Sequence, residues 1–266
     1  MSEVAAVDRV GARVIGLFEF VGALALFGAK AVVEFFRPPY EPREIARHLY
    51  QFGFRSAPLI LTAGLAIGVV LSMHTRASLE RFGAEAMIPA GLAIALIRET
   101  GPLTAGLLVS GRVGAGIGAE IGAMKVTEQI DALEANAVDA FKYLAVTRIL
   151  ALMIAMPLLT LMMDFSGIFG GYLAEAAVSG MSWHLYFERA FTYITYSDLI
   201  PATLKTIAFG YLIAVAASYL GFNTSRGTEG VGDASTRSVV MGSMLIILSD
   251  VVLVKIIFFF YPPVSG

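Results

Sequence analysis

Cysteine is absent from the 266-residue sequence, and histidine occurs only three times. Without cysteine the chain has neither disulfides nor thiolate metal ligands. His48, His74 and His184 share no i, i+4 spacing on a helix, which argues against a paired histidine metal site. We therefore expect no metal and no cofactor in this chain.

Charge is also scarce. Only 15% of the residues are charged, whereas soluble domains carry about 25%. Hydrophobic residues make up 57% of the sequence, and its mean hydropathy is +0.76. The formal charge of -2 and the scattered basic residues argue against nucleic-acid binding. The composition predicts an all-α integral membrane protein.

Long apolar runs are abundant, and a membrane-spanning helix needs about 20 such residues. Candidate spans lie at Ala57–Met73, Met87–Gly111, Phe141–Ala174, Leu199–Phe222 and Val239–Tyr261. We expect one domain over residues 1–266, with a transmembrane region at 57–261. Five spans put the two termini on opposite sides of the membrane.

The segment Val10–Phe36 is apolar but interrupted by charges. A cleavable signal peptide ending near Ala23-Leu24-Ala25 is one interpretation, but Glu19 inside the apolar stretch argues against it. We favour an amphipathic helix along the membrane interface, residues 10–36. The prolines of "RPPYEPRE" then break that helix before the first span.

Lysine and arginine indicate the orientation, because cytoplasmic connections are enriched in them. Basic residues precede the first span and flank the connection between the second and third: Arg37, Arg43, Arg47, Arg55, Arg112, Lys125, Lys142 and Arg148. Arg226 and Arg237 flank the connection between the fourth and fifth spans. We expect the N-terminus and both basic connections in the cytoplasm, and the C-terminus on the opposite side.

Ionisable residues also lie inside the predicted spans: Arg98 and Glu99 in the second, Lys205 in the fourth and Asp250 in the fifth. Such a charge at a helix centre costs about 2.5–3.5 kcal/mol on insertion, so these groups should face inward. Ion pairs Glu99–Lys205 or Arg98–Asp250 are one interpretation. A polar pocket for the headgroup of an amphiphile is the other. Pro102 frees the carbonyl of Arg98 and predicts a kink.

Small residues recur every fourth position at Ser110, Gly114, Gly118 and Gly122. Such a series lets two helices approach closely in a membrane. A dinucleotide-binding loop is the rival interpretation, but the full GxGxxG spacing is missing and no strand precedes it. The series therefore predicts helix packing.

The longest polar segment between spans is "EIGAMKVTEQIDALEANAVD", residues 120–139. Its apolar residues follow a helical spacing, and Thr127 is a candidate N-cap for a short helix. Two interpretations remain open from these residues: a solvated amphipathic loop, or a helix that docks onto a cytoplasmic partner.

Together with these features, "RETGPLTAGLLVSGRVGAGIGAEIGAMKVTEQIDAL" resembles the signature region of the MlaE permease family, the membrane subunits of Mla/MCE-type phospholipid ABC transporters. The resemblance extends to "ATLKTIAFGY", "STRSVV" and "LSDVVL", and so covers nearly the whole chain.

The resemblance implies a homodimer in a bacterial inner membrane that moves phospholipid and maintains outer-membrane lipid asymmetry. Its implied partners are a MlaF-like ABC ATPase that holds ATP and Mg, with or without a STAS-type accessory protein, and a periplasmic MCE-domain ring similar to MlaD. Arg98, Glu99, Lys205 and Asp250 match positions near the family's transport pathway, and Leu71, Ser72 and Thr75 are expected in the cavity wall. The implied coupling helix comprises Thr127, Glu128, Gln129, Ile130, Asp131, Ala132, Leu133 and Glu134.

Independently of the resemblance, the sequence has no GxxxxGK[ST] motif, so a transporter that uses ATP needs a separate ATPase subunit. An ion-coupled secondary carrier of lipids or other amphiphiles is the main alternative, with Glu99, Lys205 and Asp250 as a relay. A membrane enzyme or a passive scaffold is disfavoured, because no nucleophile stands beside an orienting base.

Overall fold

The computed structural model describes residues 2–225 and 227–260, and the regular structure over these residues is helical. Five helical segments are long and apolar enough to cross a membrane: Pro42–Phe82, Glu85–Val126, Phe141–Ser179, Tyr196–Phe222 and Gly227–Phe260. The all-α membrane fold and the five predicted spans are thereby confirmed. Each helical segment extends beyond its predicted span at one end or both. Tyr261, the last residue of the predicted fifth span, lies outside the described residues.

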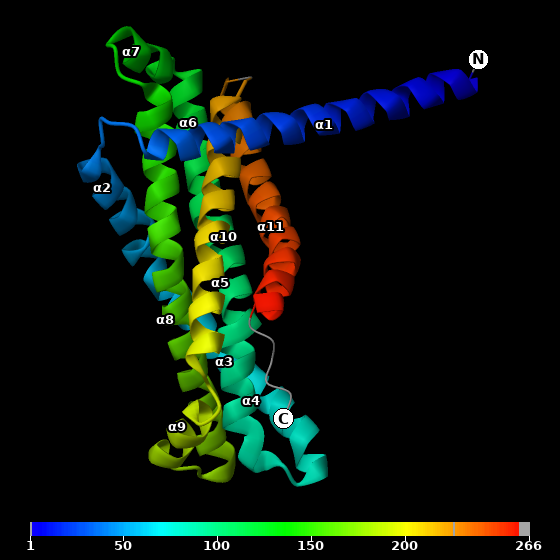
Figure 1. The fold of residues 1–266 in the computed structure, drawn as a ribbon, viewed down its shortest axis with the longest axis vertical. Helices are drawn as coiled ribbons and strands as arrows, with labels where there is room; N and C mark the ends of the chain where they lie inside the picture. The colour runs from blue at the N-terminus through cyan, green and yellow to red at the C-terminus, as the bar shows by residue number, and fades with distance from the viewer. Residues whose placement is uncertain (1, 226, 261–266) are drawn as a thin grey trace.

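Helix α1 (Ser2–Phe35) lies crosswise over one end of the bundle, at the same end as α7 (Gln129–Ala135) (Figure 1). Its inner face is fixed by aromatic contacts of Phe27, whose ring centroid lies 4.9 Å from that of Phe141 and 5.6 Å from that of Tyr219. Apolar side chains such as Phe18 and Leu26 are exposed on α1. The crosswise placement and the exposed apolar side chains agree with the predicted interfacial helix.

The first span is built from α2 (Pro42–Phe52), a short turn η1 (Phe54–Ser56) and α3 (Ala57–Leu79). Two further turns, η2 (Glu80–Phe82) and η3 (Glu85–Met87), lead into the second span.

The second span is a continuous helix with two π-helical interruptions. It runs through α4 (Ile88–Ala95), η4 (Leu96–Thr100), α5 (Gly101–Val109), η5 (Ser110–Gly114) and α6 (Ala115–Val126). The first π segment ends directly before Gly101-Pro102. Because Pro102 has no N–H and its ring crowds the preceding turn, the α-helical ladder cannot run through this point. Where the sequence predicts a kink, the structure has a π-helical turn, a feature often found at functional sites.

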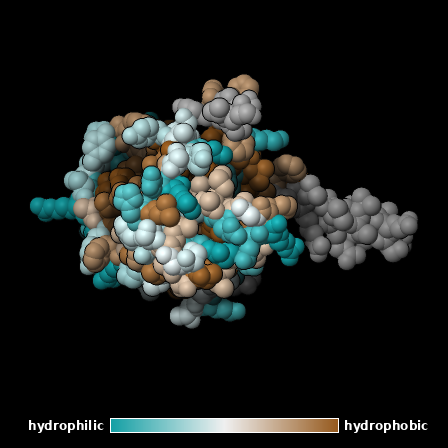
Figure 2. All heavy atoms as spheres, turned by 90° about the horizontal axis from the view of Figure 1, so that it is seen from below, coloured by the Kyte–Doolittle hydropathy of each residue, from teal (hydrophilic) through white to brown (hydrophobic). Residues whose placement is uncertain are grey.

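The remaining chain forms η6 (Phe141–Val146), α8 (Thr147–Ser179), α9 (Trp183–Phe191), α10 (Tyr196–Phe222) and α11 (Gly227–Phe260). Helix α9 closes the end of the bundle opposite α7 (Figure 1). Seen from that end, hydrophilic side chains in teal and white cover much of the surface, with apolar brown patches among them (Figure 2). The α9 end of the bundle therefore presents a largely polar surface.

Helices α3 and α8 pack closely because glycines line their contact. A Cβ atom added to Gly68 would collide with the backbone carbonyl of Gly167, and one added to Gly170 would collide with that of Leu65. Lipid tails are as apolar as the side chains they replace, so helices in a membrane associate mainly through such close van der Waals packing. These glycines set the separation of the first and third spans.

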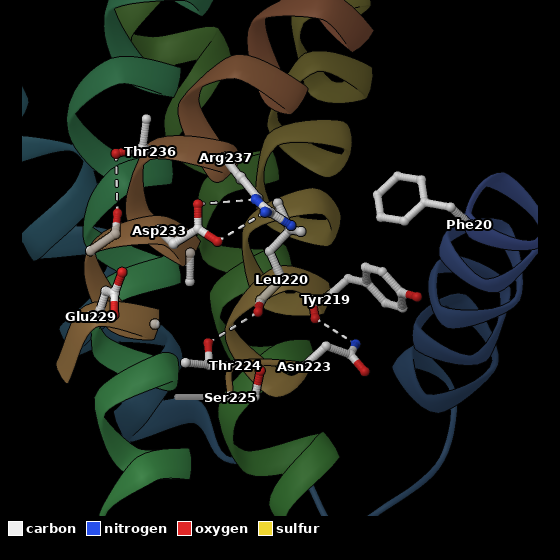
Figure 3. A pocket seen from close by; sticks show the side chains of 13 residues that line it. Phe20, Tyr219, Leu220, Asn223, Thr224, Ser225, Glu229, Asp233, Thr236 and Arg237 are labelled. Atoms are coloured by element: carbon white, nitrogen blue, oxygen red, sulfur yellow. Dashed lines mark hydrogen bonds and ion pairs between the residues drawn. The ribbon is translucent and has the colours of Figure 1, made fainter. Parts of the chain in front are cut away.

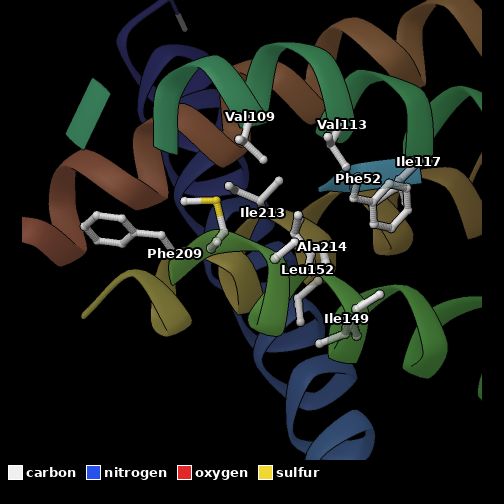
Figure 4. Close-up of a cluster of buried hydrophobic side chains, with 14 of the residues drawn as sticks. Phe52, Val109, Val113, Ile117, Ile149, Leu152, Phe209, Ile213 and Ala214 are labelled. Atoms are coloured by element: carbon white, nitrogen blue, oxygen red, sulfur yellow. The ribbon is translucent and has the colours of Figure 1, made fainter. Parts of the chain in front are cut away.

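A core of buried apolar side chains joins α2, the second span, α8 and α10 (Figure 4). Its labelled members are Phe52, Val109, Val113, Ile117, Ile149, Leu152, Phe209, Ile213 and Ala214. Helix α11 contributes little to this core. Ile246 is buried in it, but Met244, Leu248 and Val251 are more than half exposed.

Candidate functional site

The small-residue series on η5 and α6 lies against α10 and α11. A Cβ at Gly118 would collide with Ser238 on α11, and one at Gly122 would lie 2.8 Å from Oγ1 of Thr224. Gly114 faces Ile213 on α10, and the hydroxyl of Ser110 donates to the Val239 carbonyl over 3.2 Å. Through these four residues the second span packs closely against the last two spans.

Lys205 is the centre of a charge cluster in the bundle. Its Nζ lies 2.8 Å from Oε2 of Glu99 and 3.0 Å from Oδ1 of Asp250, so three spans meet at one ammonium. The Lys205 side chain is only 1% exposed, and that of Asp250 12%. By contrast, 43% of the Glu99 side chain is exposed. The cluster is closed on the α10–α11 side and open at Glu99.

Arg98 does not pair with Asp250, contrary to one of the predicted ion pairs. Its Nη2 lies 2.6 Å from Oδ1 of Asp198, in the first turn of α10. The other carboxylate oxygen of Asp198 accepts hydrogen bonds from the backbone N–H and the hydroxyl of Thr195, which together cap α10. Neighbouring residues on a helix point about 100° apart. Arg98 accordingly contacts the first turn of α10 at Asp198, whereas Glu99 contacts Lys205 further along the same helix.

Two carboxyl groups that sequence reasoning missed lie on α8. Asp164 is 3% exposed, and neither of its carboxylate oxygens has a hydrogen-bond partner among the described residues. Glu175 is 1% exposed and pairs with Arg76 on α3. A hydropathy average over the third span hides a single acid, and Glu175 follows the end of the predicted span by one residue. A scan for isolated acids within apolar runs finds both.

The three residues predicted in the cavity wall have different surroundings. Ser72 is fully buried between α3 and α8 and donates a hydrogen bond of 2.9 Å to Oε1 of Glu175. Thr75 is partly buried. Leu71 lines an apolar groove of about 290 Å³ on α3, together with Ala66, Ile67, Val70 and His74. Only Leu71 among the three predicted residues lines this groove.

The predicted cytoplasmic helix is α7, and it begins two residues later than expected. Thr127 is not its N-cap, because the Thr127 hydroxyl donates back to the Ala123 carbonyl over 2.8 Å. The residue before α7 is Glu128, with φ of 59°, and no side chain caps the helix. Ile130 is buried at 2% exposure and anchors α7 on the bundle. The rest of the predicted coupling segment, apart from the partly buried Leu133, is exposed.

A second hollow lies between α1 and the α10–α11 connection, at the α7 end of the bundle (Figure 3). Its volume is about 770 Å³. Phe20 on α1 faces Tyr219 across it, and Arg237 pairs with Asp233 over 3.0 Å on the α11 side. Glu229 also lines this hollow, which lies at the end of the bundle and not, like the Lys205 cluster, between three spans.

Among known proteins, a family model described as "Permease MlaE" matches residues 45–256. A probable ABC transporter permease protein of Rickettsia bellii is 36% identical over 251 residues, which cover 94% of this chain and 97% of that protein. The intermembrane phospholipid transport system permease protein MlaE of Haemophilus influenzae is 31% identical over 255 residues, covering 95% of this chain and 97% of that protein.

The chloroplastic protein TRIGALACTOSYLDIACYLGLYCEROL 1 of Arabidopsis thaliana is 29% identical over 236 residues, which cover 89% of this chain and 67% of that protein. The matched region contains the interrupted second span, the charge cluster and α7. The five spans, the signature residues and these matches agree: this chain belongs to the MlaE permease family.

Proposed function

We propose that this chain is the membrane subunit of an ATP-driven phospholipid transporter. The observation that carries the proposal is the half-exposed carboxylate of Glu99 beside the buried ammonium of Lys205. Within a membrane, an ionisable group of this kind faces a wet cavity or a polar partner, because contact with acyl chains is costly. A phospholipid headgroup is such a partner.

The charges are arranged to receive a headgroup on one side of the second span. The Arg98 side chain is 36% exposed and that of Glu99 43%, and both lie on η4. A guanidinium binds phosphate strongly, and a carboxylate binds the ammonium of a zwitterionic headgroup. The apolar groove that includes Leu71 offers a surface for acyl chains.

A second copy of the chain completes this cavity in our proposal. Five spans are few for a pathway that passes a two-tailed lipid, and most closed assemblies of identical chains are symmetric dimers. The exposed apolar surface of α11 supports the dimer, because α11 is the most hydrophobic span and the least covered by the rest of the chain.

The proposed partners lie at the two ends of the bundle. An ABC ATPase similar to MlaF, with ATP and Mg, would bind at α7, with or without a STAS-type accessory protein. A ring of MCE domains similar to MlaD would bind at the α9 end. The N-terminus would then be cytoplasmic and the C-terminus periplasmic, in the inner membrane of a bacterium whose outer-membrane lipid asymmetry the system maintains. The proposal draws on the names of the bacterial relatives.

We expect Glu128→Lys and Asp131→Lys to release the ATPase. Both side chains are exposed, and Asp131 forms an ion pair with Lys125 over 3.1 Å. A lysine in place of either acid reverses the charge at that position. The buried anchor Ile130 is untouched, so the bundle should keep its stability. The measurement is co-purification stoichiometry, with an expected drop of about tenfold in bound ATPase at fixed concentrations.

Glu188→Lys is the matched control for these variants. Glu188 is an exposed acid on α9, at the opposite end of the bundle, and it undergoes the same change of charge. It should leave ATPase binding unchanged. Full ATPase stoichiometry in the Glu128 and Asp131 variants would show that α7 is not the docking element.

Native mass spectrometry of the tagged chain, solubilised gently from its own host, tests the proposed assembly. Two copies with two ATPase subunits and bound phospholipid are the expected result. Lipid transfer in proteoliposomes then separates the two candidate functions. Transfer that needs ATP and survives collapse of the proton gradient supports the ABC permease. Transfer that persists without nucleotide and stops with the gradient supports the ion-coupled carrier, which the Glu99–Lys205–Asp250 cluster also suits.

A further inference from the structure

Asp164 is a buried carboxyl that has no hydrogen-bond partner in the part of the chain that the structure describes. It lies inside the third span on α8, is 3% exposed, and neither oxygen meets a hydrogen-bond donor among the described residues. Burying a polar group without a hydrogen bond is costly, and burying an unpaired carboxylate costs much more. A protein keeps such a group when it has a partner in another state or a role in function.

Asp164 packs on the helix interruption that carries Glu99. Its Oδ1 lies directly against the backbone of Gly101, where a Cβ atom would collide with it. Gly101 is the first residue of α5 and follows η4, so it is two residues from Glu99. The absence of a side chain at Gly101 makes room for the carboxyl at this point.

Lys205 is the cation that can pair with the Asp164 carboxyl. Its Nζ lies 2.8 Å from Oε2 of Glu99, and Glu99 is two residues before Gly101, whose backbone contacts the Asp164 carboxyl. An ammonium has three N–H donors. In this conformation it donates to Glu99 and forms an ion pair with Asp250, whose Oδ1 accepts no hydrogen bond from the described residues. One buried ammonium therefore pairs with two carboxyl groups, Glu99 and Asp250, and a third nearby carboxyl, Asp164, has no partner among the described residues.

We propose that Asp164 is the second acceptor for the Lys205 ammonium during transport. The inference rests on the proposed function and adds a step to it. A headgroup entering at the exposed Glu99 competes with Lys205 for that carboxylate. Lys205 then turns from Glu99 toward Asp164, so that neither the lysine nor the aspartate is left unpaired in the membrane. Asp164 is in this sense a positioning residue that acts through Lys205.

The first experiment compares Asp164→Asn with Thr160→Val in the reconstituted complex. Thr160 is a fully buried polar residue one turn earlier on α8, and its hydroxyl bonds only to the Met156 carbonyl of its own helix. We expect Asp164→Asn to lower lipid transfer per complex by about tenfold, with assembly and thermal stability unchanged because no bond is lost. Thr160→Val should transfer lipid normally. Wild-type transfer by Asp164→Asn would overturn the proposal and leave Asp164 a passive carboxyl.

The dependence on Lys205 is tested by repeating Asp164→Asn in a Lys205→Met background. If Asp164 acts through Lys205, the second substitution causes no further loss of transfer. The same fractional loss with and without Lys205 would show that Asp164 acts independently, and would overturn the proposal.

A stability measurement tests the inference even if the proposed function fails. Glu99→Gln removes one acceptor of Lys205 and should shift the ammonium toward Asp164. Asp164→Asn should then lower the melting temperature by a few degrees in the Glu99→Gln background, although it has no effect alone. Additive effects on the melting temperature would contradict the exchange. Absence of ATP-dependent transfer by the wild-type complex would instead count against the proposed function.

Discussion

Lys205→Met is expected to lower lipid transfer by about tenfold or more per assembled complex. The Lys205 ammonium lies between the carboxylates of Glu99 and Asp250, and its loss leaves both without this cation. Breaking a buried pair from one side also costs about 3–5 kcal/mol of stability. Transfer should therefore be measured in proteoliposomes and normalised to the amount of folded complex.

Two further variants separate function from folding. Lys255→Met is the matched control, because Lys255 is an exposed lysine on the same apolar α11 that carries Asp250. It should behave as wild type. The triple variant Glu99→Gln, Lys205→Met, Asp250→Asn removes all three charges and should recover stability without recovering transfer. Wild-type transfer by the triple variant would show that the cluster only holds the helices together.

Gly68→Leu is expected to prevent the first and third spans from packing, with the largest loss of stability among these variants. The added side chain would enter the backbone of Gly167 on α8, which cannot move aside as a flexible side chain can. Overpacking of a core costs about 1–3 kcal/mol even where side chains can shift, so we expect at least this loss for Gly68→Ala and failure to fold for Gly68→Leu. Thermal unfolding in detergent measures the difference.

Gly91→Leu is the control for the Gly68 variants. Gly91 lies in α4, and a Cβ atom there would have no neighbour within 4 Å. Its substitution should leave the melting temperature close to that of the wild-type protein. Equal stability of Gly68→Leu and Gly91→Leu would contradict the close contact between α3 and α8.

The sequence alone was sufficient for features that depend on neighbouring residues. An apolar run of about 20 residues forms a membrane-crossing helix whatever surrounds it, so the five spans were predicted correctly. Pro102 interrupts the second span because proline removes a hydrogen bond from its own helix. The charges of the cluster were recognised for the same reason, since each costs insertion energy within its own span.

Tertiary structure decided which of these charges meet. Arg98 binds Asp198 and not Asp250. Glu175 pairs with Arg76, and Asp164 contacts the backbone of Gly101, both distant in sequence. Thr127 likewise hydrogen-bonds back to α6 and leaves the start of α7 uncapped. Such choices depend on the depth and rotation of each helix in the bundle. The depth and rotation are set by close contacts between helix backbones, such as that of Gly68 with Gly167. These contacts, and not the composition of either helix, determine which side chains face each other.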